Sequence, residues 1–305
     1  MYYQLNYCII SIMEKDTRKI GFIGLGIMGA PMCANIAKKH GGRVFAFDID
    51  PKRTSAVAEA GATACSSAGE LARKCDVIIS MVPKSEHSLS LYTELLPDLN
   101  SKKTCIDMST ISPGTSVKIA GMLATKKVPF MDAPVVKSRP AAEAGKLGIY
   151  AGGDKAVFEK IKNILGYMGE NIIYLGANGS GLVMKICHNA LVAQIQNGVN
   201  ETLSLALKNG INIDDFTTAI SYGGATNFYL DSKAAALKTG DYTTNFSVDN
   251  MFKDLGICAE MCAKAGLDLP GMRNALRVYT EAENSGLGKE DFCSTFKTVS
   301  GKDRA

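Results

Sequence analysis

Short runs rich in β-branched and aromatic residues alternate with stretches of helical periodicity from Lys19 onward. We expect a strand in each of seven runs: KIGFIG, RVFAFD, DVIISMV, KTCIDMS, VPFMDAP, LGIYAGG and NIIYLG. Strands that alternate with helices form βαβ units, and such units build a sheet whose strands run mostly parallel. The pattern therefore predicts an α/β fold for this part of the chain.

Helix-start signals fall between these runs, where a βαβ arrangement needs them. Asp50 and Ser112 each precede a proline, and Asp154 precedes a helical stretch, so each is expected to be an N-cap. The segment SAGE, from Ser67 to Glu70, has the spacing of a capping box, in which each side chain accepts a hydrogen bond from the backbone N–H of the other residue. These signals predict where four helices begin.

The pattern changes after about Gly176, where the strands end and helical periodicity continues. The stretch from about Gly179 to Asn209 has no helix breaker and is followed by Gly210, a residue suited to a C′ cap. We expect a single helix of about 30 residues and about 45 Å there.

The predicted organisation has three parts. Residues 1–18 form an extension that we expect to be disordered, with Met13 as an alternative start. Residues 19–178 form the α/β domain, and residues 179–305 form an all-α substrate and dimerisation domain that begins with the long helix.

Composition limits the classes of function that fit. Of the 305 residues 46% are hydrophobic and 21% charged, which is typical of a globular α/β protein. The net charge of +4 is spread along the chain without a Lys/Arg block, so we expect a small anionic ligand and no nucleic acid. No apolar run is long enough to span a bilayer, and a signal peptide is not expected. Nine scattered cysteines without CxxC or zinc spacing predict free thiols, a cytoplasmic location and no metal site.

The first candidate site is the glycine-rich turn in GFIGLGIMGAPM, directly after the first expected strand. Its glycines have the GxGxxG spacing, which supplies a tight turn, close approach of the backbone to a diphosphate, and close helix–strand packing. The N-terminus of the next helix would offer unpaired N–H groups to the phosphates. We expect a dinucleotide to bind along Gly24, Leu25, Gly26, Ile27, Met28 and Gly29.

Asp48 ends the second expected strand about twenty residues after that turn, where a carboxylate can accept hydrogen bonds from the adenosine ribose. Because the same charge would repel the 2′-phosphate of NADP, NAD is the expected cofactor. Arg53 lies nearby and could bind that phosphate or stack on adenine, which keeps NADP open. Met81, Val82 and Pro83 close another strand and are expected to lie over the cofactor.

The second candidate site is at the start of the long helix, in GSGLVMKICHNALVAQ. Lys185 and Asn189 are one turn apart on a polar line that continues through Gln196 and Asn200. A partly desolvated lysine beside a nicotinamide ring would have a lowered pKa and could exchange a proton with a hydroxyl or carbonyl oxygen. Gly181, one turn earlier, would leave room for the substrate. The alternative is a lysine whose stem packs while its amine reaches water.

Four motifs, in this order, resemble those of the β-hydroxyacid dehydrogenase family: GFIGLGIMGAPM, DMSTISP, DAPV with AGKL downstream, and GLVMKICHN. A fifth motif, FSVDNMFKDL, resembles the late lysine motif of that family. The resemblance covers about residues 19 to 300. It implies a Rossmann domain with a doubly wound parallel sheet, joined by a long helix to an all-α domain, and a homodimer or homotetramer.

By position, the resemblance implies that Lys185 is the general acid/base and that Asn189 orients the substrate. Ser109 matches the serine that binds the substrate carboxylate, and the adjacent Thr110 is expected at the cofactor. Lys253 matches the lysine that reaches both nicotinamide and substrate. The implied reaction moves a hydride between NAD(P)(H) and a small hydroxyacid or semialdehyde, of the 3-hydroxyisobutyrate, tartronate semialdehyde or succinic semialdehyde type.

The chain departs from the family pattern at a turn that usually reads SGG, where Val136, Lys137 and Ser138 stand instead. Backbone N–H groups of such a turn approach the acid group of the substrate, so either the bulkier turn still does so or side chains there, Arg139 included, assist. In the alternative, the two cations point to solvent. The basic turn also resembles sulfolactaldehyde reductases, which makes a sulfonate aldehyde an alternative substrate. His188 replaces the first asparagine of K-x-x-N-N, and it could tune Lys185, contact the substrate or pack.

Two other functions use the same fold. A dinucleotide-binding module without chemistry would be expected to lack the lysine, and imine reductases commonly replace it with an acidic or aromatic residue. Because Lys185 is present, the sequence favours the hydroxyacid reaction over both.

Overall fold

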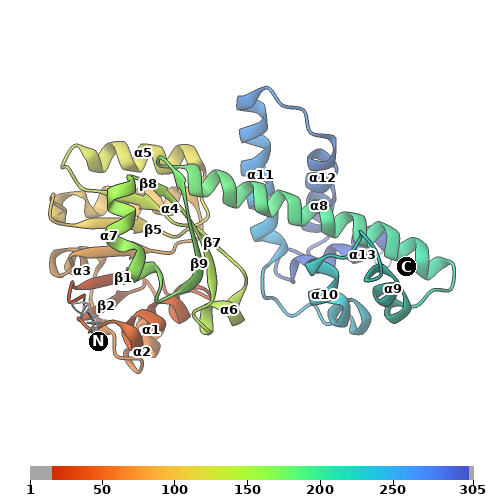
Figure 1. Ribbon diagram of the computed structural model, residues 1–305, viewed down its shortest axis with the longest axis horizontal. Coiled ribbons are helices and arrows are strands. Elements are labelled where there is room, and N and C mark those ends of the chain that lie inside the picture. The colour runs from red at the N-terminus through yellow and green to blue at the C-terminus, as the bar shows by residue number, and fades with distance from the viewer. Residues whose placement is uncertain (1–15, 302–305) are drawn as a thin grey trace, which may run out of the picture.

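The structure, a computed structural model, describes residues 16–301. Within these residues one nine-stranded sheet has the order β3-β2-β1-β4-β5-β6-β8-β7, with β9 paired to β8 (Figure 1). The strands are β1 (Ile20–Ile23), β2 (Val44–Phe47), β3 (Thr63–Ala64), β4 (Val77–Ser80), β5 (Thr104–Asp107), β6 (Phe130–Asp132), β7 (Val135–Val136), β8 (Leu147–Gly153) and β9 (Gly169–Gly176). All seven expected strands are confirmed. The sequence pattern missed β3 and β7 because two residues are too few to show alternation.

Neighbouring strands run parallel from β3 through to β6, which confirms the expected βαβ construction. The direction reverses at β8, which runs antiparallel to β6 and β7. A parallel return would need a crossover of about a dozen residues or more, and only residues 137–146 separate β7 from β8. The short connection therefore produces the reversal.

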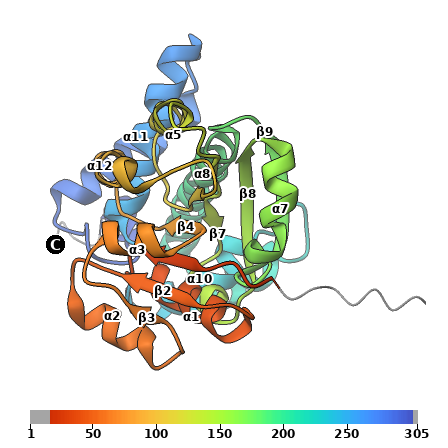
Figure 2. The same cartoon turned by 90° about the vertical axis from the view of Figure 1, so that its left-hand side faces the viewer.

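Helices cover both faces of this sheet, so it is doubly wound as expected (Figure 2). One face carries α1 (Gly29–Lys39), α2 (Pro51–Ala58), α6 (Arg139–Glu143) and α7 (Lys155–Leu165). The other carries α3 (Ala68–Lys74), α4 (Ser85–Leu95) and α5 (Pro113–Ala124). Because successive strand residues point to opposite faces, Ile79 belongs to the first core and Ile78 to the second.

The expected helix caps are only partly confirmed. Asp50 accepts a hydrogen bond from the N–H of Lys52, and Asp154 accepts one from Val157. Ser67 caps α3, but the Glu70 carboxylate accepts from the N–H and hydroxyl of Ser66 instead of returning to Ser67. Ser112 precedes α5 without a capping side-chain bond. The capping box and the Ser112 cap were therefore wrong in detail, although each helix begins where predicted.

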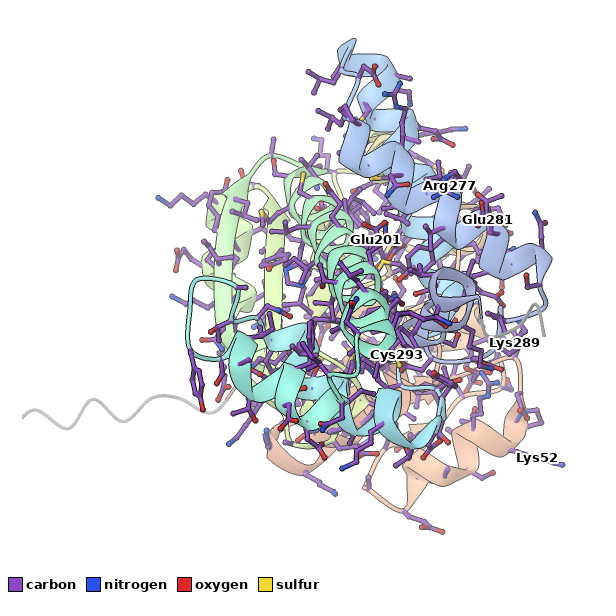
Figure 3. All side chains as sticks on the ribbon, turned by 90° about the vertical axis from the view of Figure 1, so that its right-hand side faces the viewer. Lys52, Glu201, Arg277, Glu281, Lys289 and Cys293 are labelled. Carbon is purple, nitrogen blue, oxygen red and sulfur yellow. The ribbon has the colours of Figure 1, made fainter. Side chains whose placement is uncertain are left out.

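The described residues after β9 form helices joined by loops. They form α8 (Ser180–Lys208), α9 (Ile213–Ile220), α10 (Phe228–Thr239), α11 (Val248–Ala265), α12 (Pro270–Asn284) and α13 (Thr295–Ser300). The expected long helix is confirmed, because α8 has 29 residues. Figure 3 looks roughly along α8, with α12 seen from the side; Arg277 and Glu281 pair along α12 at 2.5 Å, whereas Cys293 is buried. Among the described helices, none combines the length and the hydropathy that a membrane span needs.

The long helix α8 belongs to two cores. Leu182 packs with α3, α4 and α5 against the sheet, whereas Ile186, one turn later, packs with the C-terminal helices. Figure 1 shows α8 leaving the sheet and running through the second group of helices. The boundary at 178/179 stays a prediction; it lies in the turn between β9 and α8.

The first described residues differ from the expectation of a disordered extension over residues 1–18. Arg18 pairs with Asp16 at 2.6 Å and donates to the carbonyl of Lys160 on α7, and Asn163 donates to Asp16. Residues 16–18 are therefore part of the fold, held by polar contacts that apolar patterning does not report. Met13 and the rest of the predicted extension lie outside the described residues.

Gly181 has a structural purpose that differs from the expected one. A Cβ at this position would lie 2.2 Å from the carbonyl oxygen of Tyr150. The missing side chain therefore lets α8 approach β8 closely, and the idea that it leaves room for a substrate was wrong.

We predict opposite effects of two Gly→Ala changes in helices. Gly181→Ala should lower the free energy of unfolding by about 2 kcal/mol, because the new methyl group overlaps the Tyr150 carbonyl. Gly121→Ala, on α5 with nothing within 4 Å of the new atom, should raise it by about 0.5 kcal/mol. Denaturant unfolding measures both, and equal stability of the two variants would contradict the packing argument.

Candidate active site

Two of the three turn glycines are required by the packing of the protein itself. Gly24 has a positive φ of 92°, and a Cβ there would lie 2.2 Å from the carbonyl oxygen of Met81. A Cβ at Gly29 would lie 1.9 Å from the carbonyl oxygen of Gly24. These glycines allow the tight turn between β1 and α1 and the close contact of α1 with it.

The middle glycine differs. The nearest atom to a Cβ at Gly26 would be the Arg53 guanidinium, 3.9 Å away, so no protein atom requires a glycine there. The start of α1 beside it has no capping side chain and no acidic residue in its first turn. Open space, a bare backbone and an uncapped helix N-terminus together fit the diphosphate of a dinucleotide.

Asp48 holds the glycine turn from the end of β2. Its Oδ2 accepts a hydrogen bond from the Leu25 N–H at 2.6 Å, and its Oδ1 accepts one from the Asp50 N–H at 2.8 Å. Each carboxylate oxygen has a further lone pair for a ribose hydroxyl. Arg53 lies 3.9 Å from the same carboxylate and is half exposed. The carboxylate expected to favour NAD and the cation that could bind the phosphate of NADP therefore lie side by side.

Lys185 is buried, with 7% of its surface exposed, so the alternative of an amine in bulk water is excluded. Its Nζ donates to Oδ1 of Asn189 at 3.1 Å, and Nδ2 of Asn189 donates to Oδ2 of Asp254 at 2.6 Å. Burial lowers the pKa of Lys185 to about 8, with the Asp254 carboxylate opposing the change and the Lys253 cation adding to it. The amine can therefore exchange a proton near neutral pH.

Asp254 is a site residue that the sequence reasoning missed. It follows Lys253 in FKDL on α11, and its side chain is almost completely buried. Only its place beside the motif lysine could have indicated it, because an acidic residue on an amphipathic helix ordinarily faces water.

A continuous series of contacts joins the two candidate sites. Lys253 donates from Nζ to the Thr110 carbonyl at 2.5 Å and lies 3.0 Å from Asp254. The hydroxyl of the neighbouring Ser109 accepts from the Val82 N–H at 2.8 Å and is also hydrogen-bonded to the buried Asp107 carboxylate. Since Met81 packs over the glycine turn, residues predicted at four separate places in the sequence meet at one edge of the sheet. Pro83 is exposed at the end of this series.

The far end of the polar line on α8 is structural. Gln196 donates to the carbonyl of Phe292 at 2.5 Å, and Asn200 donates to Thr295 at 3.2 Å. Tyr279 also donates to Gln196. This part of the line holds α8 against the C-terminal helices, and only Lys185 and Asn189 belong to the candidate site.

The turn at residues 136–138 keeps the backbone shape of a glycine. Lys137 has a φ of 75°, a left-handed conformation that side chains disfavour. Its amine donates to the Lys146 carbonyl at 2.9 Å and pairs with Glu170 at 3.1 Å, while Arg139 pairs with Glu143. Lys137 and Arg139 are therefore both paired with carboxylates at the surface, which agrees with the alternative that the two cations point to solvent. Val136 is buried, and Ser138 makes no capping bond at the start of α6.

His188 is in contact with a tyrosine. Its Nδ1 lies 3.4 Å from the hydroxyl of Tyr150, and the two rings pack edge to face. Burial and the nearby Lys185 cation lower the pKa of His188 to about 4. The imidazole is therefore neutral at the pH at which Lys185 titrates.

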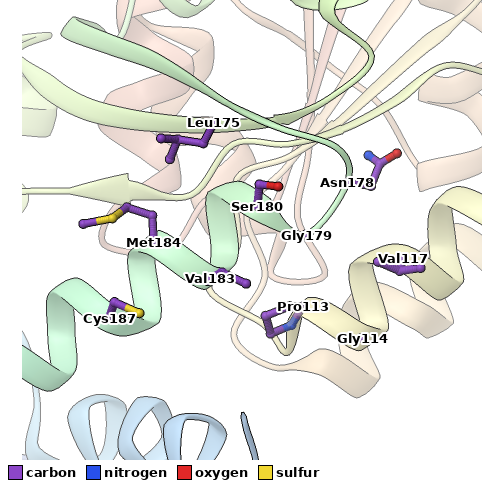
Figure 4. A pocket seen from close by; sticks show the side chains of 10 residues that line it. All are labelled: Pro113, Gly114, Val117, Leu175, Asn178, Gly179, Ser180, Val183, Met184 and Cys187. Atoms are coloured by element: carbon purple, nitrogen blue, oxygen red, sulfur yellow. The ribbon is translucent and has the colours of Figure 1, made fainter. Parts of the chain in front are cut away.

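A cavity lies elsewhere on α8 (Figure 4). It has a volume of about 520 Å³ and is lined by Pro113 and Val117 of α5 and by Val183, Met184 and Cys187 of α8. Val183 and Cys187 project about 160° away from Lys185 around the helix. This cavity is therefore separate from the candidate site. In the described residues no cluster of His, Cys, Asp or Glu could hold a metal ion.

Comparisons with known proteins identify the family of the chain. Residues 19–176 match the NAD binding domain of 6-phosphogluconate dehydrogenase, and residues 179–299 match the NAD-binding region of NADP-dependent 3-hydroxyisobutyrate dehydrogenase. The chain is 33% identical to 2-(hydroxymethyl)glutarate dehydrogenase of Eubacterium barkeri, covering 93% of this chain and 95% of that protein. It is 36% identical to 3-hydroxyisobutyrate dehydrogenase of Pseudomonas aeruginosa, covering 93% and 99%.

The chain belongs to the β-hydroxyacid dehydrogenase family. The expected fold is confirmed by 3-hydroxyisobutyrate dehydrogenase of Mycobacterium tuberculosis with L-serine, which has a TM-score of 0.85 and 28% identity over 93% of this chain and 99% of that one. As a β-hydroxyacid dehydrogenase, the protein is an NAD(P)-dependent oxidoreductase that acts on the CH–OH group of a hydroxyacid. This excludes the module without chemistry.

We predict that the charge of Asp48 sets the cofactor preference of this dehydrogenase. Asp48→Asn keeps an acceptor for Leu25 but removes the charge that repels a 2′-phosphate, so the ratio of kcat/KM for NADH to that for NADPH should fall about tenfold, equivalent to about 1.4 kcal/mol. Asp50→Asn is the control, because Asp50 also pairs with Arg53 but at an exposed position. An equal fall in both variants would assign the effect to release of Arg53, and no fall in Asp48→Asn would contradict the prediction.

Proposed function

We propose that Lys185 is the general acid/base of the reaction and that Asn189 and Asp254 hold its amine in line with the reacting oxygen. The observation that carries this proposal is the hydrogen-bonded series Lys185, Asn189, Asp254, buried at the junction of the two cores and next to the cofactor-facing residues. The bound nicotinamide supplies the hydride in reduction and accepts it in oxidation.

The protein moves the proton that accompanies the hydride. In the reductive direction, the protonated Lys185 donates to the carbonyl oxygen as negative charge develops there. In oxidation the neutral amine accepts the hydroxyl proton, and a pKa of about 8 lets one group serve both directions. Asn189 uses its carbonyl oxygen to direct the amine, and Asp254 fixes the amide through its other end.

The acid group of the substrate is proposed to lie between Ser109 and the turn at 136–138. Ser109 is held in place by Val82 and by the Asp107 carboxylate, and its hydroxyl would turn from Asp107 to donate to the acid group. The left-handed backbone at Lys137 supports a turn whose N–H groups face the acid, while the Lys137 amine stays with Glu170. Ser138 has a hydroxyl without a capping partner and is the remaining side-chain donor of this turn.

We propose a small hydroxyacid or its semialdehyde as substrate, with NAD as the preferred cofactor. Curated relatives act, by their names, on 2-(hydroxymethyl)glutarate, 3-hydroxyisobutyrate, L-serine, and glyoxylate or succinic semialdehyde. A sulfonate aldehyde is the second candidate, and the pairing of Lys137 and Arg139 with carboxylates weakens it.

We also propose that the protein forms a homodimer or homotetramer and that it is located in the cytoplasm. Met184, Leu191 and Leu205 are exposed along α8, and apolar side chains in a row on one helix favour burial between subunits of a homodimer or homotetramer. The cysteines among the described residues are all unpaired, which favours the reducing cytoplasm.

Loss of the amine should abolish turnover while cofactor binding remains. Lys185→Ala should lower kcat by about 1,000-fold on the best substrate from a panel of 3-hydroxyisobutyrate, 2-(hydroxymethyl)glutarate, L-serine, succinic semialdehyde and sulfolactaldehyde. The Kd for NADH should stay within about twofold, because the glycine turn and Asp48, which are proposed to hold the diphosphate and the ribose, do not touch Lys185. Lys208→Ala, at the far end of the same helix, is the control. Normal turnover of Lys185→Ala would remove the mechanism.

The pH dependence should identify the titrating group. The reductive kcat should fall as the pH rises through about 8, because the amine loses the proton it donates. Asp254→Asn should move this midpoint to lower pH by about one unit, and Lys253→Met should move it to higher pH, because the two charges act on Lys185 in opposite senses. His188→Asn should leave it in place, since His188 is already neutral there. Shifts in the same direction for Asp254→Asn and Lys253→Met would contradict the assignment to Lys185.

A further inference from the structure

The N-terminus of α8 has no local cap. Its N-cap position is Gly179, which has no side chain and a φ of 93°, and Ser180 makes no capping bond in its place. The first N–H groups of a helix need acceptors, and their absence at a buried helix end is costly. The acceptors for α8 must therefore come from elsewhere in the fold.

Asp132, the last residue of β6, provides them. Its Oδ1 accepts from the Gly179 N–H at 2.6 Å, and its Oδ2 accepts from the Leu182 N–H at 3.2 Å. The Ser116 hydroxyl of α5 donates to Oδ1 at 3.2 Å. With 1% of its surface exposed, the carboxylate joins one strand to the first turn of a helix 47 residues later.

Two glycines leave space for this carboxylate. A Cβ at Gly152 of β8 would lie 2.7 Å from Oδ2 of Asp132, and a Cβ at Gly181 would lie 2.9 Å from it. The same Cβ at Gly152 would lie 2.8 Å from the Gly181 N. The Asp132 carboxylate is therefore packed between β8 and α8. If α8 slid along its axis or turned about it, a hydrogen bond to Asp132 would break.

We propose that Asp132 is a positioning residue for the reaction: it sets the axial position and the rotation of α8, and through them the place of the Lys185 amine. Leu182, which it holds, is three residues before Lys185, about 4.5 Å along the helix. Asn189, one turn after Lys185, is held from the other side by Asp254. The amine thus lies between two anchors, one from the sheet and one from α11. This inference rests on the proposed role of Lys185.

The test compares kcat, cofactor affinity and the pH midpoint of Asp132→Asn with those of the parent enzyme. Asparagine keeps one acceptor but presents an NH₂ group to one of the two helix N–H groups. The kcat should fall about 10- to 100-fold, since a displacement of about 1 Å can have this effect. The Kd for NADH should stay within about twofold. The pH midpoint should move from about 8 to higher pH, because an amine displaced from its buried seat is easier to protonate.

Two further variants keep the outcome interpretable if Asp132→Asn folds poorly. Gly152→Ala leaves the carboxylate in the chain but displaces it from the opposite side, and it should give the same alkaline shift with a smaller loss of kcat. Ser116→Ala removes one hydrogen bond to the same carboxylate without touching α8, and its kcat should stay within about twofold and its midpoint unchanged. The melting temperature of each variant, compared with the assay temperature, shows whether the variant is folded in the assay.

A merely structural Asp132 would lower the melting temperature and the active fraction but leave the pH midpoint of the folded enzyme in place, and that result would overturn the proposal. So would a parent-like kcat in Asp132→Asn. These failures differ from failure of the proposed function, because Lys185→Ala would still be inactive. An active Lys185→Ala variant would instead remove the role on which this inference depends.

Discussion

The buried amine of Lys185 is the constraint to which the rest of the site responds. A pKa reduced from 10.5 to about 8 corresponds to about 3 kcal/mol in favour of the neutral amine, and an isolated cation in such a place would not persist. Asn189 accepts from it, and Asp254 offsets part of the desolvation from behind the amide. These partners keep the pKa of Lys185 from falling below about 8, so the amine can gain or lose a proton near neutral pH.

Placing that amine requires one rigid element shared by two cores. Since α8 contributes Leu182 to the core beneath the sheet and Ile186 to the core of the C-terminal helices, a shift of either core relative to the other moves Lys185. A helix also transmits rotation, so contacts made one turn before and one turn after the lysine determine its direction. Gly181 lets α8 pack closely against β8, and Asp132 binds the first turn of α8. Both contacts help to fix the position of this helix.

The parallel sheet brings the remaining parts to the same edge. The glycine turn follows β1, Asp48 follows β2, Met81 and Val82 follow β4, and Ser109 follows β5, so the carboxyl ends of neighbouring strands present the residues proposed to bind cofactor and substrate side by side. Lys253 closes this edge from α11 by binding the Thr110 carbonyl. Val136 pairs with β8 in the same sheet, and the left-handed Lys137 follows it directly.

Local patterns in the sequence determined the strands, the glycine turn with Asp48, the long helix and the lysine with its asparagine, because each depends on spacing within a few residues. Resemblance to a family added Ser109 and Lys253. Asp254 and Asp132 could not be found in this way: an acidic residue on a helix or at a strand end usually faces water, and both are buried only because segments 65 and 47 residues away carry the groups they bind. Tertiary structure also decided that Lys137 pairs with Glu170 at the surface and that Gln196 joins α8 to the C-terminal helices. Hydrogen-bond partners across such separations depend on how the layers pack, and no spacing along the chain records that packing.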